Sequence, residues 1–139
     1  MKKIIIALLG LSVALLADLT RDDSTQIVTD NSTTLQWQDD TNITKSWTEA
    51  ISYCEALTLG GHSDWRLPNF NELYSIADHS KRDPAIDNTF INVVSRIYWS
   101  STTVVGYVGF AWYVGFYFGD GYWVSKSNGY FVRCVRDGQ

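Results

Sequence analysis

Apolar and polar positions alternate most regularly in the last third of the chain, a pattern that predicts β-strands. Between residues 111 and 118 the alternation is strict and gives a strand one wholly apolar face. That face carries Trp112, Val114, Phe116 and Phe118. Turn residues at 119–121 (Gly-Asp-Gly) and 127–129 (Ser-Asn-Gly) separate it from apolar segments at 122–125 and 130–136. We therefore expect consecutive strands in an antiparallel meander.

Capping boxes predict two short helices before these strands. Ser46 and Glu49 begin the first, which we expect to end at the glycines 60 and 61. Its apolar face carries Ala50, Ile51, Cys54 and Leu57. Asn69 and Glu72 begin the second, over residues 70–78, with an apolar stripe of Leu73, Ile76 and Ala77. Helices followed by antiparallel strands indicate an α+β domain in which the helices cover the sheet.

The remaining segments show weaker patterns. Residues 18–30 predict a flexible polar start with a short strand near 26–29, and a second strand at 34–37 places Leu35 and Trp37 on one side. The turn at 39–42 (Asp-Asp-Thr-Asn) predicts solvated carboxylates; a calcium site is the alternative, but the spacing matches no calcium loop. The long segment 78–110 predicts a loop region held by the apolar anchors Ile86 and Phe90.

Composition and the N-terminal segment indicate an exported protein. With 139 residues, 45% of them hydrophobic, the chain can fold as one domain. Residues 1–17 carry two lysines and then an apolar run, which predicts a signal peptide before a single domain at 18–139; an uncleaved anchor is the alternative. Cleavage leaves 9 basic and 15 acidic side chains, a net charge of −6. We expect a periplasmic, secreted or cell-surface protein that has no stable membrane span after cleavage and does not bind nucleic acid.

The cysteines Cys54 and Cys134 predict one disulfide in such an exported chain. This bridge would fasten the first helix to the last strand. In the chain-entropy model, closing the loop between Cys54 and Cys134 adds on the order of 4.5 kcal/mol to the free energy of unfolding. A free thiol with a catalytic or metal-binding role is the alternative.

Known catalytic motifs do not occur in the sequence. The histidines, His62 and His79, stand in neither a metal-binding pair nor a nucleophile motif, and we interpret them as a loop residue and a helix-end residue. No spacing selects a carboxylate pair for glycoside hydrolysis. We therefore expect a protein that is not an enzyme and that holds no metal or other cofactor.

Short motifs in a fixed order identify a resemblance. They are GGHSDWRLPNFNEL at 60–73, PAIDNTF at 84–90, YWSST at 98–102, AWYV at 111–114 and VRCVR at 132–136. Through them the chain resembles, over residues 28–136, the C-terminal domain of bacterial collagen-like adhesins, the Lcl C-terminal domain family. The resemblance implies a C-type lectin-like fold. In that fold two helices flank a twisted antiparallel sheet with a long loop region, and a disulfide joins the first helix to the last strand.

The same resemblance implies roles for individual side chains. Asp64, Trp65 and Arg66 would be architectural, with the Arg66 guanidinium bridging carbonyls or a carboxylate, and Trp99 and Trp112 would lie in the core. Sugar-binding members of the lectin-like fold carry Glu-Pro-Asn or Gln-Pro-Asp together with Trp-Asn-Asp, and this sequence contains none of them. The resemblance therefore concerns the fold, and we do not expect calcium-dependent sugar binding.

Aromatic side chains beyond those of the core face predict a binding surface. Tyr113 and Tyr117 lie on the outward face of the strand at 111–118, and Tyr107, Tyr122 and Trp123 would extend this patch. We expect an exported ligand-binding or adhesion module whose partner is an extracellular glycan or protein. As alternatives, the rings cover a second hydrophobic layer, or the chain is a structural subunit that buries them in a homo-oligomer.

Overall fold

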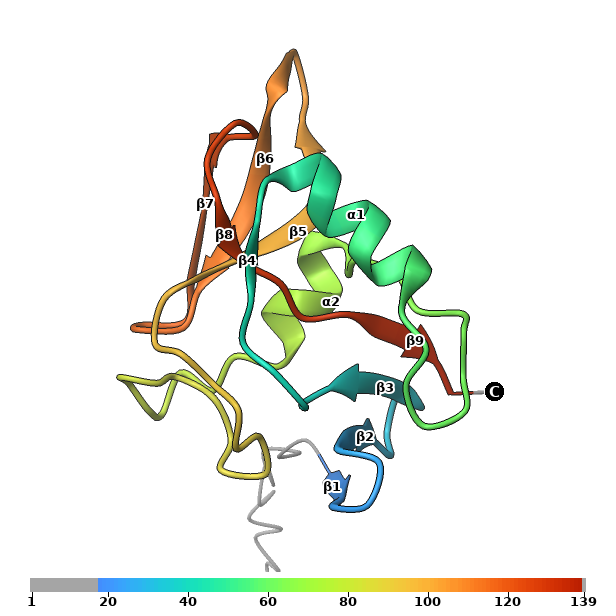
Figure 1. Cartoon of the computed structure of the whole chain (residues 1–139). Coiled ribbons are helices and arrows are strands. Elements are labelled where there is room, and N and C mark those ends of the chain that lie inside the picture. Colours follow the sequence, from blue (N-terminus) through green and yellow to red (C-terminus); the bar gives the residue numbers. More distant parts are fainter. Residues whose placement is uncertain (1–17, 139) are drawn as a thin grey trace, which may run out of the picture.

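Two β-sheets and two α-helices build the fold in the computed structural model, which describes residues 18–138 (Figure 1). The first sheet has the strand order β1-β2-β3-β9, and the second has the order β4-β8-β5-β6-β7. The strands are β1 (Leu19–Asp22), β2 (Ile27–Asp30), β3 (Leu35–Gln38), β4 (Thr44–Lys45), β5 (Ile97–Val104), β6 (Tyr107–Gly115), β7 (Asp120–Ser125), β8 (Tyr130–Phe131) and β9 (Val135–Asp137). The helices are α1 (Trp47–Ala56) and α2 (Phe70–Ser75). The α+β class is confirmed, and the predicted signal peptide lies outside the described residues.

The segment 130–136 does not form the third strand of a meander. It contributes β8 to the second sheet, antiparallel to β4 and parallel to β5, and then β9 to the first sheet, antiparallel to β3. Arg133 and Cys134 lie between these short strands and are both buried. The predicted meander is wrong because this segment crosses from one sheet to the other instead of pairing with β7.

Two hairpins that share β6 supply three of the five strands of the second sheet. β5 and β6 pair antiparallel, although residues 97–104 were expected to belong to a loop, and β6 pairs antiparallel with β7. β6 ends at Gly115, and the turn to β7 occupies residues 116–119 rather than 119–121. Phe116 therefore points into the core, whereas Phe118, predicted to be buried, is 56% exposed. β1 also replaces the flexible start expected for residues 18–30.

Two clusters of buried side chains make up the core. The first joins α2 to both sheets through Trp37, Leu73, Tyr98, Val114 and Phe116, and it includes the anchors Ile86 and Phe90. The second lies under α1 and contains Ala50, Cys54, Trp65, Trp99, Ala111, Val132 and Cys134. The predicted disulfide between Cys54 and Cys134 is confirmed, with Cα atoms 5.5 Å apart. The bridge fastens α1 to the crossing segment between β8 and β9.

The helix boundaries follow from local contacts. The Asn69 side chain accepts a hydrogen bond from the Glu72 backbone N–H at 2.8 Å, and the Glu72 carboxylate accepts one from the Asn69 N–H at 3.0 Å, so the capping box holds the start of α2. α2 ends at Ser75, three residues earlier than expected. α1 ends at Ala56, before the predicted glycines. Gly60 and Gly61 instead form a turn with φ of +59° and +77°.

The motif residues 64–66 make contacts within the fold. Arg66 makes a bidentate contact with Glu72 at 2.6 and 2.8 Å and reaches Asp137 at 2.8 Å. Asp64 accepts hydrogen bonds from Arg136 at 2.6 and 3.2 Å, and Trp65 is buried. These contacts connect the segment between the helices to β9 and α2.

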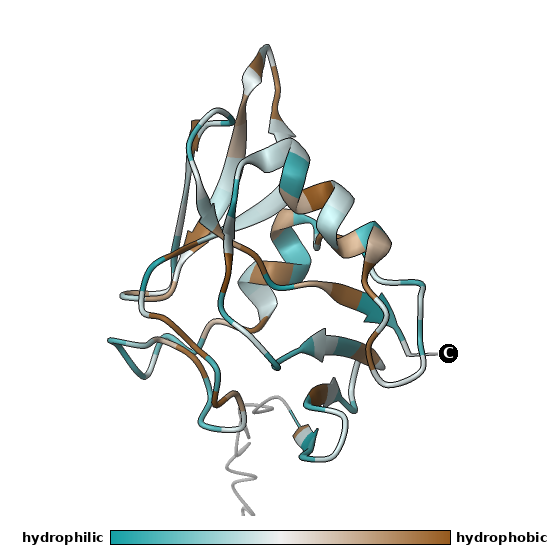
Figure 2. Cartoon of the chain, in the orientation of Figure 1, coloured by the Kyte–Doolittle hydropathy of each residue, from teal (hydrophilic) through white to brown (hydrophobic). Residues whose placement is uncertain are grey.

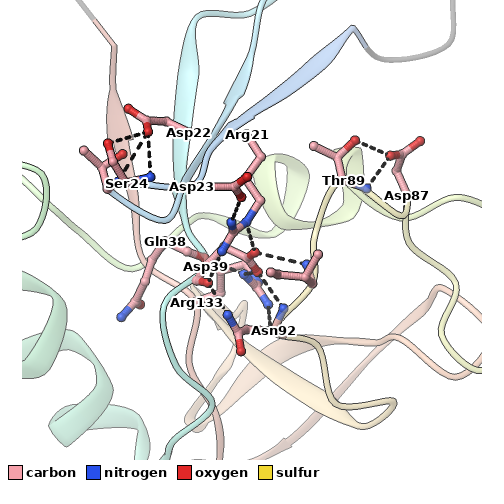
Figure 3. A network of polar contacts seen from close by, with 12 residues as sticks. Arg21, Asp22, Asp23, Ser24, Gln38, Asp39, Asp87, Thr89, Asn92 and Arg133 are labelled. Carbon is pink, nitrogen blue, oxygen red and sulfur yellow. Dashed lines mark hydrogen bonds and ion pairs between the residues drawn. The ribbon is translucent and has the colours of Figure 1, made fainter.

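Asp39 forms the centre of a buried polar network rather than a solvated turn (Figure 3). Its carboxylate accepts hydrogen bonds from Arg21 at 2.8 Å and Arg133 at 3.0 Å. The backbone N–H groups of Ile91 and Asn92 donate to the same carboxylate at 3.0 and 3.2 Å. The prediction of a solvated carboxylate is wrong here because two arginines far apart in the sequence, Arg21 on β1 and Arg133 on the crossing segment, converge on it. The network fixes the long loop after α2 against the sheets.

Candidate functional site

An aromatic row crosses from α2 over β6 to the edge strand β7. It consists of Tyr74, Phe70, Trp112, Trp123 and Tyr122, which contact one another in that order. Successive ring centroids are 5.6, 5.3, 5.0 and 4.5 Å apart. Tyr74, Trp123 and Tyr122 are 41%, 37% and 55% exposed. The row is therefore a continuous apolar strip on the surface, with a tyrosine hydroxyl at each end.

Strand register and one glycine position this row. Trp112 on β6 pairs directly with Trp123 on β7, which brings the two indoles together on one face of the sheet. Gly121 pairs with Val114, and a Cβ at position 121 would lie 2.5 Å from ring atoms of Phe70. The absence of a side chain at 121 thus lets the Phe70 ring lie against β7. The Thr102 hydroxyl accepts a hydrogen bond from the Phe70 N–H at 2.9 Å and fixes the start of α2 over the sheet.

His79 extends the row at the end of Tyr74. The two ring centroids are 5.1 Å apart, and the His79 Nε2 lies 2.8 Å from the Gly119 carbonyl oxygen. Gly119 has a φ of +78°, which an L side chain rarely adopts. The imidazole therefore connects the loop after α2 to the β6–β7 turn.

The opposite face of the same sheet carries a group of tyrosines. Tyr113 pairs with Tyr122 on β7 and with Trp99 on β5. The Trp99 ring packs edge-on against Tyr130, with ring centroids 5.1 Å apart. Burial raises the pKa of Tyr113, with smaller contributions from Asp120 and the neighbouring tyrosines. The Asp120 carboxylate lies in the space that Gly115 leaves open. This face therefore offers phenol and carboxylate groups that can exchange hydrogen bonds with a polar ligand.

A shallow apolar hollow borders the tyrosine group. Its volume is about 250 Å³, and it is lined by Val94, Arg96, Ile97, Gly129, Tyr130 and Phe131. Arg96 is the charged residue at its rim. The hollow can accept a small apolar group, but it is too small to enclose a drug-sized ligand.

The structure distributes the predicted binding residues over several places. Trp123 and Tyr122 stack on each other within the aromatic row, whereas Tyr113 lies on the other face of the sheet. Tyr107 lies at the tip of the β5–β6 hairpin, and Tyr117 lies in the β6–β7 turn against Phe118. The five residues therefore do not form one patch, because the strand ends before Tyr117 and the register places Tyr113 on the face opposite Trp123.

Some members of the row were not predicted as surface residues. Trp112 was assigned to the core, but it is only half-buried, whereas Trp99 is fully buried as expected. Phe70 and Tyr74 were not assigned to any site. Their i, i+4 spacing places both rings on the same side of α2, offset from the buried Leu73. That spacing is the signal that could have identified them.

The carboxylates near the long loop are held in local turns. The Asp78 side chain accepts hydrogen bonds from the N–H and hydroxyl of Ser80, and Asp87 accepts the same pair from Thr89. These bonds lower the pKa of both carboxyl groups. Both line a hollow of about 370 Å³ beside Asp30 and His79. Within residues 18–138, no group of three or more His, Cys, Asp or Glu side chains is placed to hold a metal ion.

Comparison with known proteins identifies the family. No curated protein matches the chain. In the part of the chain that the structure describes, no helix has the length and apolar character needed to cross a membrane. The sequence model of the Lcl C-terminal domain matches residues 26–136, which is most of the chain and includes both helices, the disulfide and the aromatic row. The chain therefore belongs to the Lcl C-terminal domain family.

Proposed function

We propose that this chain is an exported ligand-binding or adhesion module without catalytic activity, which recognises a surface glycan or a protein independently of calcium. The aromatic row carries the proposal. Its rings offer flat apolar faces to the C–H faces of a sugar or to apolar side chains, and aromatic side chains provide large contact area at low entropic cost. The hydroxyls of Tyr74 and Tyr122 add directional hydrogen bonds at its ends.

The arrangement of the chain supports a C-type lectin-like fold. β1 and β9 are the two edge strands of the same four-stranded sheet, so both ends of the described chain belong to one sheet. The disulfide joins α1 to the segment before β9, and the long segment between α2 and β5 is held by buried anchors. These are the features that the family resemblance implies. Within this fold, the aromatic row takes the role that calcium-bound residues have in the sugar-binding members.

The proposal is tested by probing glycan and protein arrays with the exported protein and measuring hits by calorimetry. Trp123→Ala and Tyr122→Ala should each weaken binding by about 1 to 4 kcal/mol, and the melting temperature should change little, because both rings are partly exposed on the edge strand β7. Ile91→Ala is the matched control, since Ile91 is 64% exposed but lies outside the row. Binding should persist in excess chelator. Undiminished binding by both aromatic variants would place the site elsewhere, and Tyr113→Ala and Tyr117→Ala then test the other predicted positions.

Self-association is the second candidate function, because β7 is an edge strand of its sheet and carries Tyr122 and Trp123. An unpaired edge can add a strand from another copy, and the rings would then be buried between subunits. Size-exclusion chromatography with light scattering distinguishes the two functions. A monomer that binds ligand supports the module, whereas a stable oligomer that Trp123→Ala dissociates supports assembly.

A further inference from the structure

The tip of the β5–β6 hairpin projects from the body of the protein with apolar side chains in solvent. Figure 1 shows this hairpin at the top of the view, at the opposite end from β1, and Figure 2 shows apolar residues at its end. Val104 pairs with Tyr107, so the turn consists of Val105 and Gly106. Val105 is 95% exposed, Val108 82% and Tyr107 65%. Such exposure of adjacent large apolar side chains indicates a contact surface.

Polar contacts from the end of β7 brace this hairpin. The Lys126 ammonium donates hydrogen bonds to the Val108 carbonyl oxygen at 2.7 Å and to the Thr103 hydroxyl at 2.9 Å. The Lys126 backbone N–H donates to the Gly109 carbonyl oxygen at 2.9 Å. The valines are therefore presented by a supported hairpin, and a charged nitrogen lies just behind them.

The hairpin carries no charge of its own. Residues 97–119 contain no Asp, Glu, Lys, Arg or His, although charged residues make up 19% of the chain. The β5–β6 register shifts between Thr103 and Val104, but Lys126 donates hydrogen bonds to the carbonyl oxygens of Val108 and Gly109 at this irregularity, which lowers the cost of removing the tip from water. Charge, backbone and side chains at the tip are therefore all compatible with a non-aqueous environment.

We propose that this tip, Val105 to Phe110, inserts into the interfacial region of a lipid bilayer. Val105 and Val108 would enter the acyl boundary. Tyr107 and Phe110, which pack edge-on at 6.4 Å, would lie at the headgroup level, where aromatic side chains are favoured. The Lys126 ammonium stays bonded to Thr103 and Val108 and would hold the hairpin in shape at the membrane surface.

The available area favours lipid over a protein partner. Val105, Tyr107, Val108 and Phe110 expose apolar surface on the order of 500 Å², less than the roughly 800 Å² per partner of a stable protein interface. The tip is also convex, so a protein would need a matching pocket, whereas a bilayer adapts to the inserted shape. Lipid contact should be weak and reversible, as for a short apolar anchor.

A fluorophore at the tip tests the proposal on the full chain. Val105→Cys is labelled with an environment-sensitive nitrobenzoxadiazole dye, because both native cysteines are in the disulfide. Vesicles of phosphatidylcholine, with or without phosphatidylglycerol, should shift its emission to shorter wavelength and increase its intensity severalfold. The same dye at Glu55→Cys, an exposed position on α1, should not respond.

Second-site variants connect the signal to the tip. Val108→Asp in the labelled chain should lower the apparent vesicle affinity at least about tenfold, because a charge at this depth is costly, whereas Ile91→Asp should not. Half-molar salt should leave the signal in place, since the contact is apolar. A dye at 105 that stays in water while the chain floats with vesicles would overturn the proposal. An unchanged signal in Val108→Asp, or a response only to a cell-surface protein, would overturn it too.

Discussion

Replacing Gly121 by alanine should disrupt the aromatic row from beneath. The new Cβ would lie 2.5 Å from two ring atoms of Phe70, so the ring must move away from β7 and from its contact with Trp112. Overpacking of this kind costs about 1 to 3 kcal/mol, and alanine returns roughly 0.4 to 1 kcal/mol by restricting the unfolded chain. We expect a net loss of about 1 to 2 kcal/mol and a fall in melting temperature of roughly 4 to 8 °C.

Gly109→Ala is the matched control, because Gly109 also lies in a strand and a Cβ there meets no atom within 4 Å. Its melting temperature should equal or exceed that of the wild type. Thermal unfolding gives the stability of both variants, and near-ultraviolet circular dichroism reports the environment of Trp112 and Trp123. If Gly121→Ala were as stable as Gly109→Ala and its aromatic spectrum were unchanged, the packing of Phe70 against β7 would be refuted.

Three further changes test the rest of the fold. Alkylation of the unreduced, unfolded protein should find no free thiol, and Cys54→Ala should lower the free energy of unfolding by about 2 to 5 kcal/mol. Asp39→Asn should lower the free energy of unfolding, measured in urea, by about 3 to 5 kcal/mol, because Arg21 and Arg133 lose their buried counter-charge. Asp23→Asn is the control and should have almost no effect, because the Asp23 side chain is 90% exposed. The contact with Arg66 lowers the pKa of Glu72, so its stabilisation is complete above the unfolded pKa of about 4.3 and is lost as the pH falls through the lower folded pKa; Glu72→Gln should flatten that loss.

Local signals in the sequence predicted the helices and the disulfide, whereas the role of Arg66 was implied by the family resemblance. A capping box and an apolar stripe are contained within a few residues, and two cysteines allow one pairing, so no knowledge of the fold is needed. The anchors Ile86 and Phe90 were found for the same reason. The C-type lectin-like assignment and the ligand-binding role remain proposals.

These local signals could not predict which residues far apart in the sequence come into contact. Asp39 looks like a turn residue, and its burial depends on Arg133, 94 positions later. The segment 130–136 alternates regularly, yet its strands pair with β3, β4 and β5 rather than with β7. β5 was missed because serines and threonines interrupt its apolar pattern, although its Tyr-Trp pair and the Val-Gly turn after it favour a hairpin. For the candidate site, the i, i+4 spacing of Phe70 and Tyr74 is visible in the sequence. Their contact with Trp112 is not, because it depends on how β6 and β7 pair.

The crossing of residues 130–137 between the sheets has a consequence for how the chain acquires its fold. Ribosomes and translocation channels deliver a chain from its N-terminus, and domains usually begin to fold as soon as their parts emerge. Here β3 and β4 cannot acquire their partners β9 and β8 until the crossing segment arrives, and the cysteine partner of α1 arrives with it. Folding of the N-terminal part alone is therefore unfavourable, because the entropy of closing a long loop must be overcome before these contacts form. A chain built this way closes only after the crossing segment has emerged, and the disulfide between Cys54 and Cys134 can form only then.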